Sequence, residues 1–246
     1  MPKENRQLYI GTSGWNYKAW KDTFYKGVKQ KEWLQHYATK FNAVEVNATF
    51  YRLLKESTVQ GWDEKTPEGF SFAVKGSRYI SHTKKLKPDP DSVGKQRDNL
   101  KPLGEKARAV LWQTPGSLQK DLDVLQEFGK KLADWPGVEH VLEFRHESWF
   151  DQETAKVMHD LNLGNCISDS GKWPRWDQVT GSVAYVRLHG APETYVSAYS
   201  DEELQQWAEK IKNWINEGKT VHIYFDNTDQ GAAADNALTL QGMLLD

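Results

Sequence analysis

Two segments decide the fold class: GSVAYVRLHG at residues 181–190 and, after an intervening helix, KTVHIYFDN at residues 219–227. Side chains of a β-strand alternate between two faces. In the first segment one face is wholly apolar, while Arg187 and His189 share the other. In the second, Asp226 ends the polar face. Strands with one apolar face and one face that turns polar at the carboxyl end are typical of a barrel with helices outside and a site at the top.

Strand-like segments recur along the whole chain and alternate with helix-length connections. The predicted strands cover residues 8–11, 43–47, 70–75, 109–113, 139–145, 163–169, 181–190 and 219–227. The predicted helices cover residues 28–41, 57–65, 91–108, 117–133, 151–161, 201–216 and 230–244. This alternation predicts an α/β fold, a TIM (β/α)8 barrel of parallel strands with outer helices. A doubly wound open sheet is the alternative, but no GxGxxG or GxxxxGK[ST] phosphate loop occurs.

Length and composition agree with a single barrel. The chain has 246 residues, close to the roughly 250 typical of this fold. No linker, low-complexity tract or charge block divides it, so residues 1–7 are expected to form a flexible polar tail and residues 8–246 a single TIM-barrel domain. Hydrophobic residues make up 38% and charged residues 27%, which indicates a soluble protein with a buried core.

Charge and hydropathy limit the partners. The net charge of −2 argues against strong non-specific binding to nucleic acid or anionic membranes, although it allows a local basic patch. The single cysteine, Cys166, permits no internal disulfide. No apolar run reaches the roughly 20 residues that span a bilayer, and the first residues lack the apolar core of a signal peptide. We therefore expect a cytoplasmic protein without a membrane partner.

Several motifs together resemble the YecE-like family, known as domain of unknown function 72. They are GTSGWNYKAW, VEVNATFYR, FAVKGSRYISH, LWQTPGS, HVLEFRHESWF, YVRLHG and VHIYFDNTDQGAAADNA, in this order along nearly the whole chain. The resemblance implies a TIM-barrel fold and no settled activity. One departure is FYKG at residues 24–27, where the family commonly has a proline after the tyrosine, and this affects only the shape of that loop.

Polar residues at the strand ends form the candidate site, because chemistry in TIM barrels takes place at the carboxyl ends of the strands. The predicted catalytic residues are Glu45, Glu143, His189 and Asp226. The predicted substrate-binding residues are Trp15, Asn47, Lys75, Arg78, His82, Gln113, Arg145, Asp169, Arg187 and Asn227. A purely internal network is the alternative, because buried charges need partners whether or not a ligand binds.

The leading interpretation is an enzyme, hydrolase-like, that binds an anionic substrate such as a phosphate ester or phosphodiester. The cations that would bind it are Lys75, Arg78, Arg145 and Arg187. Arginine suits phosphate because its planar fork donates two parallel hydrogen bonds. His82 or His189 would act as general acid or base. The basic loop at residues 84–87, beside Tyr79, would extend the site to nucleic acid, with a solvated loop as an equally good interpretation.

Three other functions stay open. In a glycoside hydrolase, Glu45 and Glu143 would form the carboxylate pair, with Trp15, Trp149 or Trp173 stacking the sugar. In a divalent-metal-dependent phosphodiesterase or nuclease-like barrel, acidic side chains of different strands would be the ligands, but no HExxH or paired-histidine spacing occurs. A non-catalytic ligand-binding barrel would use the same pocket. We assign no cofactor and no metal.

Overall fold

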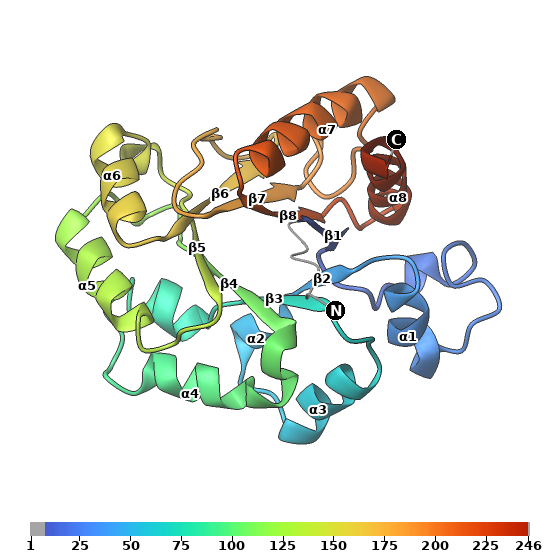
Figure 1. The fold of residues 1–246 in the computed structure, drawn as a ribbon, viewed down its shortest axis with the longest axis horizontal. Coiled ribbons are helices and arrows are strands. Elements are labelled where there is room, and N and C mark those ends of the chain that lie inside the picture. Colours follow the sequence, from blue (N-terminus) through green and yellow to red (C-terminus); the bar gives the residue numbers. More distant parts are fainter. Residues whose placement is uncertain (1–7, 246) are drawn as a thin grey trace.

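Eight parallel strands form a nearly closed barrel with helices outside, so the predicted TIM-barrel fold is confirmed (Figure 1). The structure is a computed structural model that describes residues 8–245; the predicted tail at residues 1–7 lies outside them. The strands are β1 (Leu8–Thr12), β2 (Ala43–Val46), β3 (Ser71–Lys75), β4 (Ala107–Gln113), β5 (Glu139–Glu143), β6 (Gly164–Asp169), β7 (Val183–Leu188) and β8 (Thr220–Phe225). Their order in the sheet is β1-β8-β7-β6-β5-β4-β3-β2.

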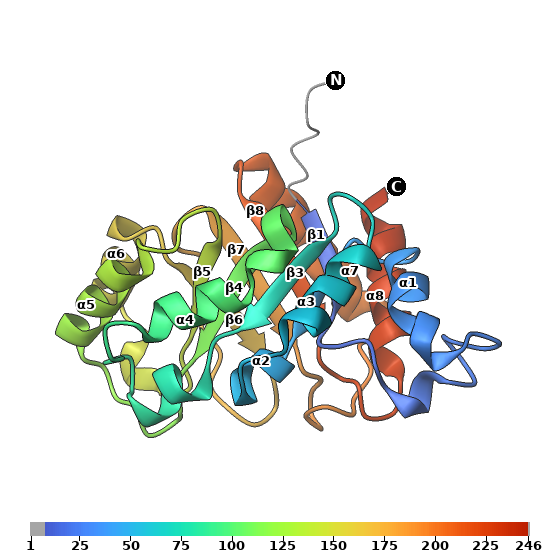
Figure 2. The ribbon, with the colours of Figure 1, turned by 90° about the horizontal axis from the view of Figure 1, so that it is seen from below.

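The helices surround the strands on the outside, except α2, which lies at the carboxyl ends of the strands (Figures 1 and 2). They are α1 (Trp33–Ala38), α2 (Ala48–Tyr51), α3 (Glu56–Glu64), α4 (Ser92–Asn99), α5 (Leu122–Leu132), α6 (Gln152–Asp160), α7 (Asp201–Asn216) and α8 (Ala232–Leu245). Short 3-10 segments are η1 (Lys18–Trp20), η2 (Gln30–Glu32), η4 (Lys101–Lys106) and η5 (Glu147–Trp149), and η3 (Tyr79–Thr83) is a π-helical turn. None of the helices at residues 8–245 has the length and apolarity that a bilayer crossing requires.

Predicted helices were too long at several ends. The helix expected at residues 91–108 stops at Asn99 and continues as η4, because Pro102 has no N–H to donate. Gly104 in η4 has a φ of 52°, and β4 starts soon after it. α5 starts at Leu122, where the Asp121 carboxylate accepts a hydrogen bond from the Val124 N–H at 3.1 Å. These ends depend on caps rather than on apolar periodicity.

Strand alternation divides the apolar residues between two cores. The core inside the barrel contains Tyr9, Ala43, Ala73, Ala109, Leu111, Val141, Cys166, Val183, Tyr185 and Tyr224. The opposite strand faces pack against the helices in a larger core outside. The inner face of each strand changes from these apolar residues to polar ones towards its carboxyl end, which places the site above a packed floor.

Side chains join β1 and β2, where the ladder consists of one bridge between Ser13 and Glu45. The Tyr37 hydroxyl accepts from the Thr12 N–H at 2.8 Å and donates to the Ala43 carbonyl at 3.0 Å. A Cβ at Gly11 would lie 1.9 Å from that same carbonyl oxygen. The barrel therefore closes here through a tyrosine and a glycine instead of a full set of strand hydrogen bonds.

Candidate functional site

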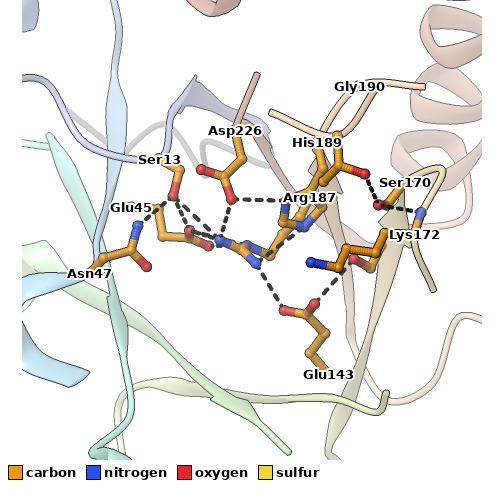
Figure 3. A network of polar contacts seen from close by, with 12 residues as sticks. Ser13, Glu45, Asn47, Glu143, Ser170, Lys172, Arg187, His189, Gly190 and Asp226 are labelled. Carbon is orange, nitrogen blue, oxygen red and sulfur yellow. Dashed lines mark hydrogen bonds and ion pairs between the residues drawn. The ribbon is translucent and has the colours of Figure 1, made fainter. Parts of the chain in front are cut away.

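Arg187, at the end of β7, is the centre of a buried polar cluster at the carboxyl ends of the strands (Figure 3). Its side chain is 2% exposed. The guanidinium donates to Glu45 through Nε and Nη2, with a shortest distance of 2.7 Å. It donates to Glu143 at 3.1 Å through Nη1 and to Asp226 at 2.9 Å through Nη2. One arginine thus binds carboxylates from β2, β5 and the end of β8.

Glu45 on β2 accepts hydrogen bonds from a residue that follows β1 and from a residue on β7. The Ser13 hydroxyl donates to its Oε1 at 2.6 Å, and the Tyr185 hydroxyl donates to its Oε2 at 2.7 Å. Asn47 donates in turn to the Ser13 hydroxyl at 2.7 Å. With Arg187 included, both oxygens of Glu45 are satisfied, and its side chain is fully buried.

Glu143 at the end of β5 is equally enclosed. It pairs with Arg145 as well as Arg187, and the Ser168 hydroxyl donates to it at 3.1 Å. Trp173 donates from its indole N–H to Ser168 at 2.8 Å, and the Arg145 guanidinium lies 3.5 Å from the centroid of the Trp173 ring. Burial by itself would raise the pKa of Glu143, but the two arginines outweigh it and lower that pKa.

His189, which directly follows β7, completes the cluster. Its Nε2 accepts from Arg187 Nη1 at 3.2 Å, which leaves the proton on Nδ1, 2.9 Å from Asp226 Oδ2. Burial and the neighbouring Arg187 lower the pKa of His189, so the ring is neutral near pH 7. Burial opposes the ionisation of Asp226, but Arg187 and His189 outweigh it and lower its pKa. Three carboxylates, those of Glu45, Glu143 and Asp226, therefore converge on Arg187.

A pocket of about 190 Å³ lies above this cluster. Its lining residues are Asn47, Tyr51, Lys75, Gln113, Arg145, Arg187, Tyr195 and Asp226. The ends of six strands (β2, β3, β4, β5, β7 and β8), helix α2 and the loop after β7 contribute to it, as expected for a ligand site at the top of a TIM barrel. Six of the eight are predicted site residues, and the two tyrosines are additions from the structure.

Tyr51 and Tyr195 form the aromatic part of the pocket. Tyr51 ends α2 and is 76% exposed. Tyr195 is 37% exposed and has a φ of 72°, which is rare for a residue with a side chain. Its N–H donates to the His189 carbonyl, and its carbonyl accepts from Asp229. Backbone strain at a pocket residue is typical of functional sites, but no sequence pattern indicates it.

Lys75 is the cation of this pocket that has no acidic partner in the part of the chain that the structure describes. Its Nζ lies 4.7 Å from the centroid of the Phe50 ring. Among residues 8–245, no carboxylate oxygen lies within 4.0 Å of Nζ. Burial and the nearby Arg187 lower the pKa of Lys75 to about 8. Lys75 is therefore mostly protonated at pH 7, with an appreciable neutral fraction.

Arg187 differs from its predicted role. The sequence-based hypothesis makes it an anion-binding cation, but its donors are directed to Glu45, Glu143 and Asp226. A guanidinium committed to three carboxylates has little capacity left for a phosphate. Arg187 organises the floor of the pocket, and Lys75 and Arg145 are the other two cations that line it.

Arg78 and His82 lie near the cationic side of the pocket but do not line it. Arg78 is exposed and precedes η3. His82 is half-buried, hydrogen-bonded through Nδ1 to the Ser81 hydroxyl at 3.0 Å. Burial, followed by the charges of Lys75, Arg78 and Arg145, lowers the pKa of His82. Gln113 does line the pocket, at the end of β4.

Three predicted site residues lie elsewhere. Asp169 faces out of the barrel, where Arg175 and Tyr199 bind it, each at 2.9 Å. Asn227 is buried and donates to the Ser197 carbonyl and to Asn236. Trp15 packs edge-on against Trp62 at 5.5 Å between ring centroids.

Alternation explains the position of Asp169. Cys166 is in the inner core, so Ser168 is the inward residue at the end of β6 and Asp169 the outward one. Ser168 is a further polar residue that the sequence-based prediction omitted, and applying the alternation from Cys166 onward identifies it. Its hydroxyl connects Trp173 to Glu143.

The acidic residues of the cluster are arranged around an arginine rather than around a vacant metal position. Within residues 8–245, no group of three or more histidine, cysteine, aspartate or glutamate side chains is arranged to hold a metal ion. The carboxylates that converge do so on the Arg187 guanidinium, which occupies the point that a cation would need.

Comparisons with known proteins identify relatives over the whole described chain. The family described as "Protein of unknown function DUF72" matches residues 9–246. UPF0759 protein YunF of Bacillus subtilis is 26% identical, with 96% of this chain and 94% of YunF covered. UPF0759 protein YecE of Escherichia coli K12 is 25% identical, with 95% and 91% covered. A crystal structure of a DUF72 family protein from Thermotoga maritima is similar with a TM-score of 0.86 and 29% identity, covering 97% of this chain and 99% of that one. The chain belongs to the DUF72 family.

Proposed function

We propose that this barrel is an enzyme that binds a small anionic substrate, a phosphate ester or a carboxylate, in the pocket at the carboxyl ends of the strands. The observation that supports this proposal most is the position of Lys75: it lines the pocket without an acidic partner among the described residues. A partly buried ammonium without a counter-ion is costly unless a ligand supplies the charge. The volume of about 190 Å³ suits a compact substrate.

Arg145 is the second anion-binding group in this proposal. It lines the pocket and pairs with Glu143, while the Trp173 ring fixes its plane. Its Nε has no hydrogen-bond partner among the described residues. A fixed guanidinium beside a lysine is a typical arrangement for binding carboxylate or phosphate. Asn47 and Gln113 also line the pocket and add neutral hydrogen-bonding groups.

The hydrolase-like reaction has weaker support than the binding of an anion. Hydrolysis needs a base or acid at the pocket, and Asp226 is the carboxylate that lines it. Arg187 and His189 hold Asp226 ionised, which makes it a weak base. Phosphate-ester hydrolysis would therefore depend on His82 or on Lys75 for proton transfer.

The glycoside-hydrolase alternative has little support from the geometry. Its two carboxylates must flank a sugar bond, but Glu45 and Glu143 are both fully buried and Arg187 lies between them. Of the three predicted stacking tryptophans, Trp149 is buried and Trp15 packs on Trp62. Trp173 is near the cluster, but its face is taken by Arg145.

Metal-dependent phosphodiester cleavage is likewise less well supported, because the acidic residues converge on Arg187. A nucleic-acid contact through the basic loop is weakened by local acids. Lys84 pairs with Asp89 at 2.9 Å, and Lys87 lies 3.8 Å from Asp121. A non-catalytic ligand-binding barrel uses the same pocket and differs only in the absence of turnover.

Calorimetric titration of inorganic phosphate and of pyruvate into the protein tests the proposal. We expect binding of one or both in wild type and a loss of about tenfold or more in affinity in Lys75→Gln, since a hydrogen bond to a charged group contributes roughly 1.5–3 kcal/mol. Lys212→Gln is the matched control, because Lys212 is exposed on α7. Equal binding in Lys75→Gln, or no binding of any anion in wild type, would contradict the proposal.

A further inference from the structure

The structure directs Lys75 into the pocket and fixes it there. Its backbone carbonyl at the end of β3 accepts from the Thr49 hydroxyl at 2.7 Å and from the Gln96 amide at 3.3 Å. Phe50 of α2 lies against the ammonium. α2 was not among the predicted helices; it lies at the carboxyl ends of the strands (Figure 2), and its Phe50 is the residue that contacts Lys75. The amine is therefore held in a defined direction, and desolvated, by two neighbouring elements.

The surroundings of Lys75 favour a neutral amine more than an ordinary lysine site does. The charged groups that act on it are Arg187, Glu143, Glu45 and Asp226, and His82 also feels its charge. The three carboxylates are already bound to Arg187. Burial and Arg187 lower the pKa of Lys75 to about 8. About a tenth of the amine is then neutral at pH 7, on the order of a hundredfold or more above an ordinary lysine.

We infer that Lys75 is a nucleophile that forms an imine with the carbonyl group of a small anionic carbonyl compound, a 2-oxo acid or an aldehyde that carries a phosphate. This inference rests on the proposed function, because the anion is what positions the carbonyl. A lysine becomes nucleophilic when it is desolvated or placed beside another cation, and both conditions hold here.

The two cations of the pocket then have separate tasks. Arg145 carries a permanent charge and binds the anionic group, which leaves Lys75 free to react as the neutral amine. In the reaction, Nζ attacks the carbonyl carbon and forms a C–N bond. The carbonyl oxygen leaves as water and takes both protons of the amine, so that a C=N bond remains. No oxidant or reductant takes part.

Reductive trapping tests the inference. The protein is incubated with pyruvate and cyanoborohydride at pH 7.5, and modified lysines are located by proteolysis and mass spectrometry. We expect Lys75 to be modified at least about tenfold more than Lys212, with a rate that rises with pH through a midpoint near pH 8. Lys75→Arg keeps the positive charge but cannot form an imine, so it should lose this modification. Lys212→Arg should keep the modification at Lys75.

A neutral probe separates the inference from the proposed function. Propanal has the carbonyl group but no negative charge. If propanal modifies Lys75 preferentially and as fast as pyruvate does, imine formation at Lys75 is supported, but the proposed role of the anion in positioning the carbonyl is contradicted. Anion binding by calorimetry without preferential trapping at Lys75 would overturn the imine while the proposed function stands. Modification spread over surface lysines in proportion to their exposure would overturn it as well. Circular dichroism of Lys75→Arg verifies that the variant is folded.

Discussion

At the scale of the residue, Arg187 shows why an arginine suits the floor of the pocket. A guanidinium presents several donors in one plane, and here they reach carboxylates of three strands. Lysine could not match this geometry, because its ammonium is a compact point charge. The desolvation of one cation and three anions is offset only while all of them remain together.

Replacement of Arg187 by glutamine should therefore destabilise the fold strongly. The substitution leaves Glu45 and Glu143 buried without a counter-charge, and breaking a buried ion pair in this way costs about 3–5 kcal/mol. Urea denaturation measures the change in the free energy of unfolding. The matched control is Arg175→Gln, whose partly exposed partners are Asp169 and Asp177, with an expected change of about 0–1 kcal/mol. Similar losses in both variants would contradict a special role for the buried cluster.

At the scale of the element, β5 carries a second buried histidine that links three segments. His140 accepts from the Trp112 indole N–H through Nδ1 at 3.2 Å, so its proton is on Nε2, 3.1 Å from the Trp135 carbonyl. Protonation of Nδ1 would place two donors face to face. Burial lowers the pKa of His140 to about 4. The packing of β4, β5 and the turn after α5 therefore requires neutral imidazole.

This element should make stability depend on pH. Between pH 6.5 and 4 the unfolded chain binds a proton at His140 and the folded chain does not, so the free energy of unfolding falls as the pH falls. The contribution is on the order of 3 kcal/mol. His140→Asn keeps an acceptor but cannot titrate, and we expect it to reduce the slope of stability against pH, measured by urea denaturation at each pH. Part of the slope should remain in this variant, because the pKa of His189 is also lowered in the folded protein.

The control for this prediction is His159→Asn on α6, where the side chain is 76% exposed. It should leave the slope unchanged. If His140→Asn and wild type lose the same free energy between pH 6.5 and pH 4, the buried neutral imidazole is not the cause.

At the scale of the whole molecule, the sequence predicted the barrel well, because period-2 alternation and strand–helix order recur along the entire chain. The same alternation predicted that Glu45, Glu143, Arg187, His189 and Asp226 would share one face. It did not predict which charges would be free, since pairing depends on strand order and on side chains brought together across the barrel. Lys75 and Arg187 look equivalent in the sequence, but only Lys75 has no acidic partner among the described residues.

The barrel closes between β1 and β2 through side chains, and the last prediction concerns this junction. Tyr37→Phe removes the hydroxyl that binds the Thr12 N–H and the Ala43 carbonyl. Two buried backbone groups lose their partner, which costs about 1–3 kcal/mol. We expect amide hydrogen exchange at Thr12 to accelerate more than exchange in β5, because opening begins where the strand ladder is weakest. Tyr79→Phe is the control, because it removes a hydroxyl of an exposed tyrosine that is bound to Asp89. It should change neither the free energy of unfolding nor the exchange rate at Thr12. Uniform acceleration in all strands would mean that the barrel opens only by global unfolding, and that the β1–β2 junction is as strong as the hydrogen-bonded strand pairs.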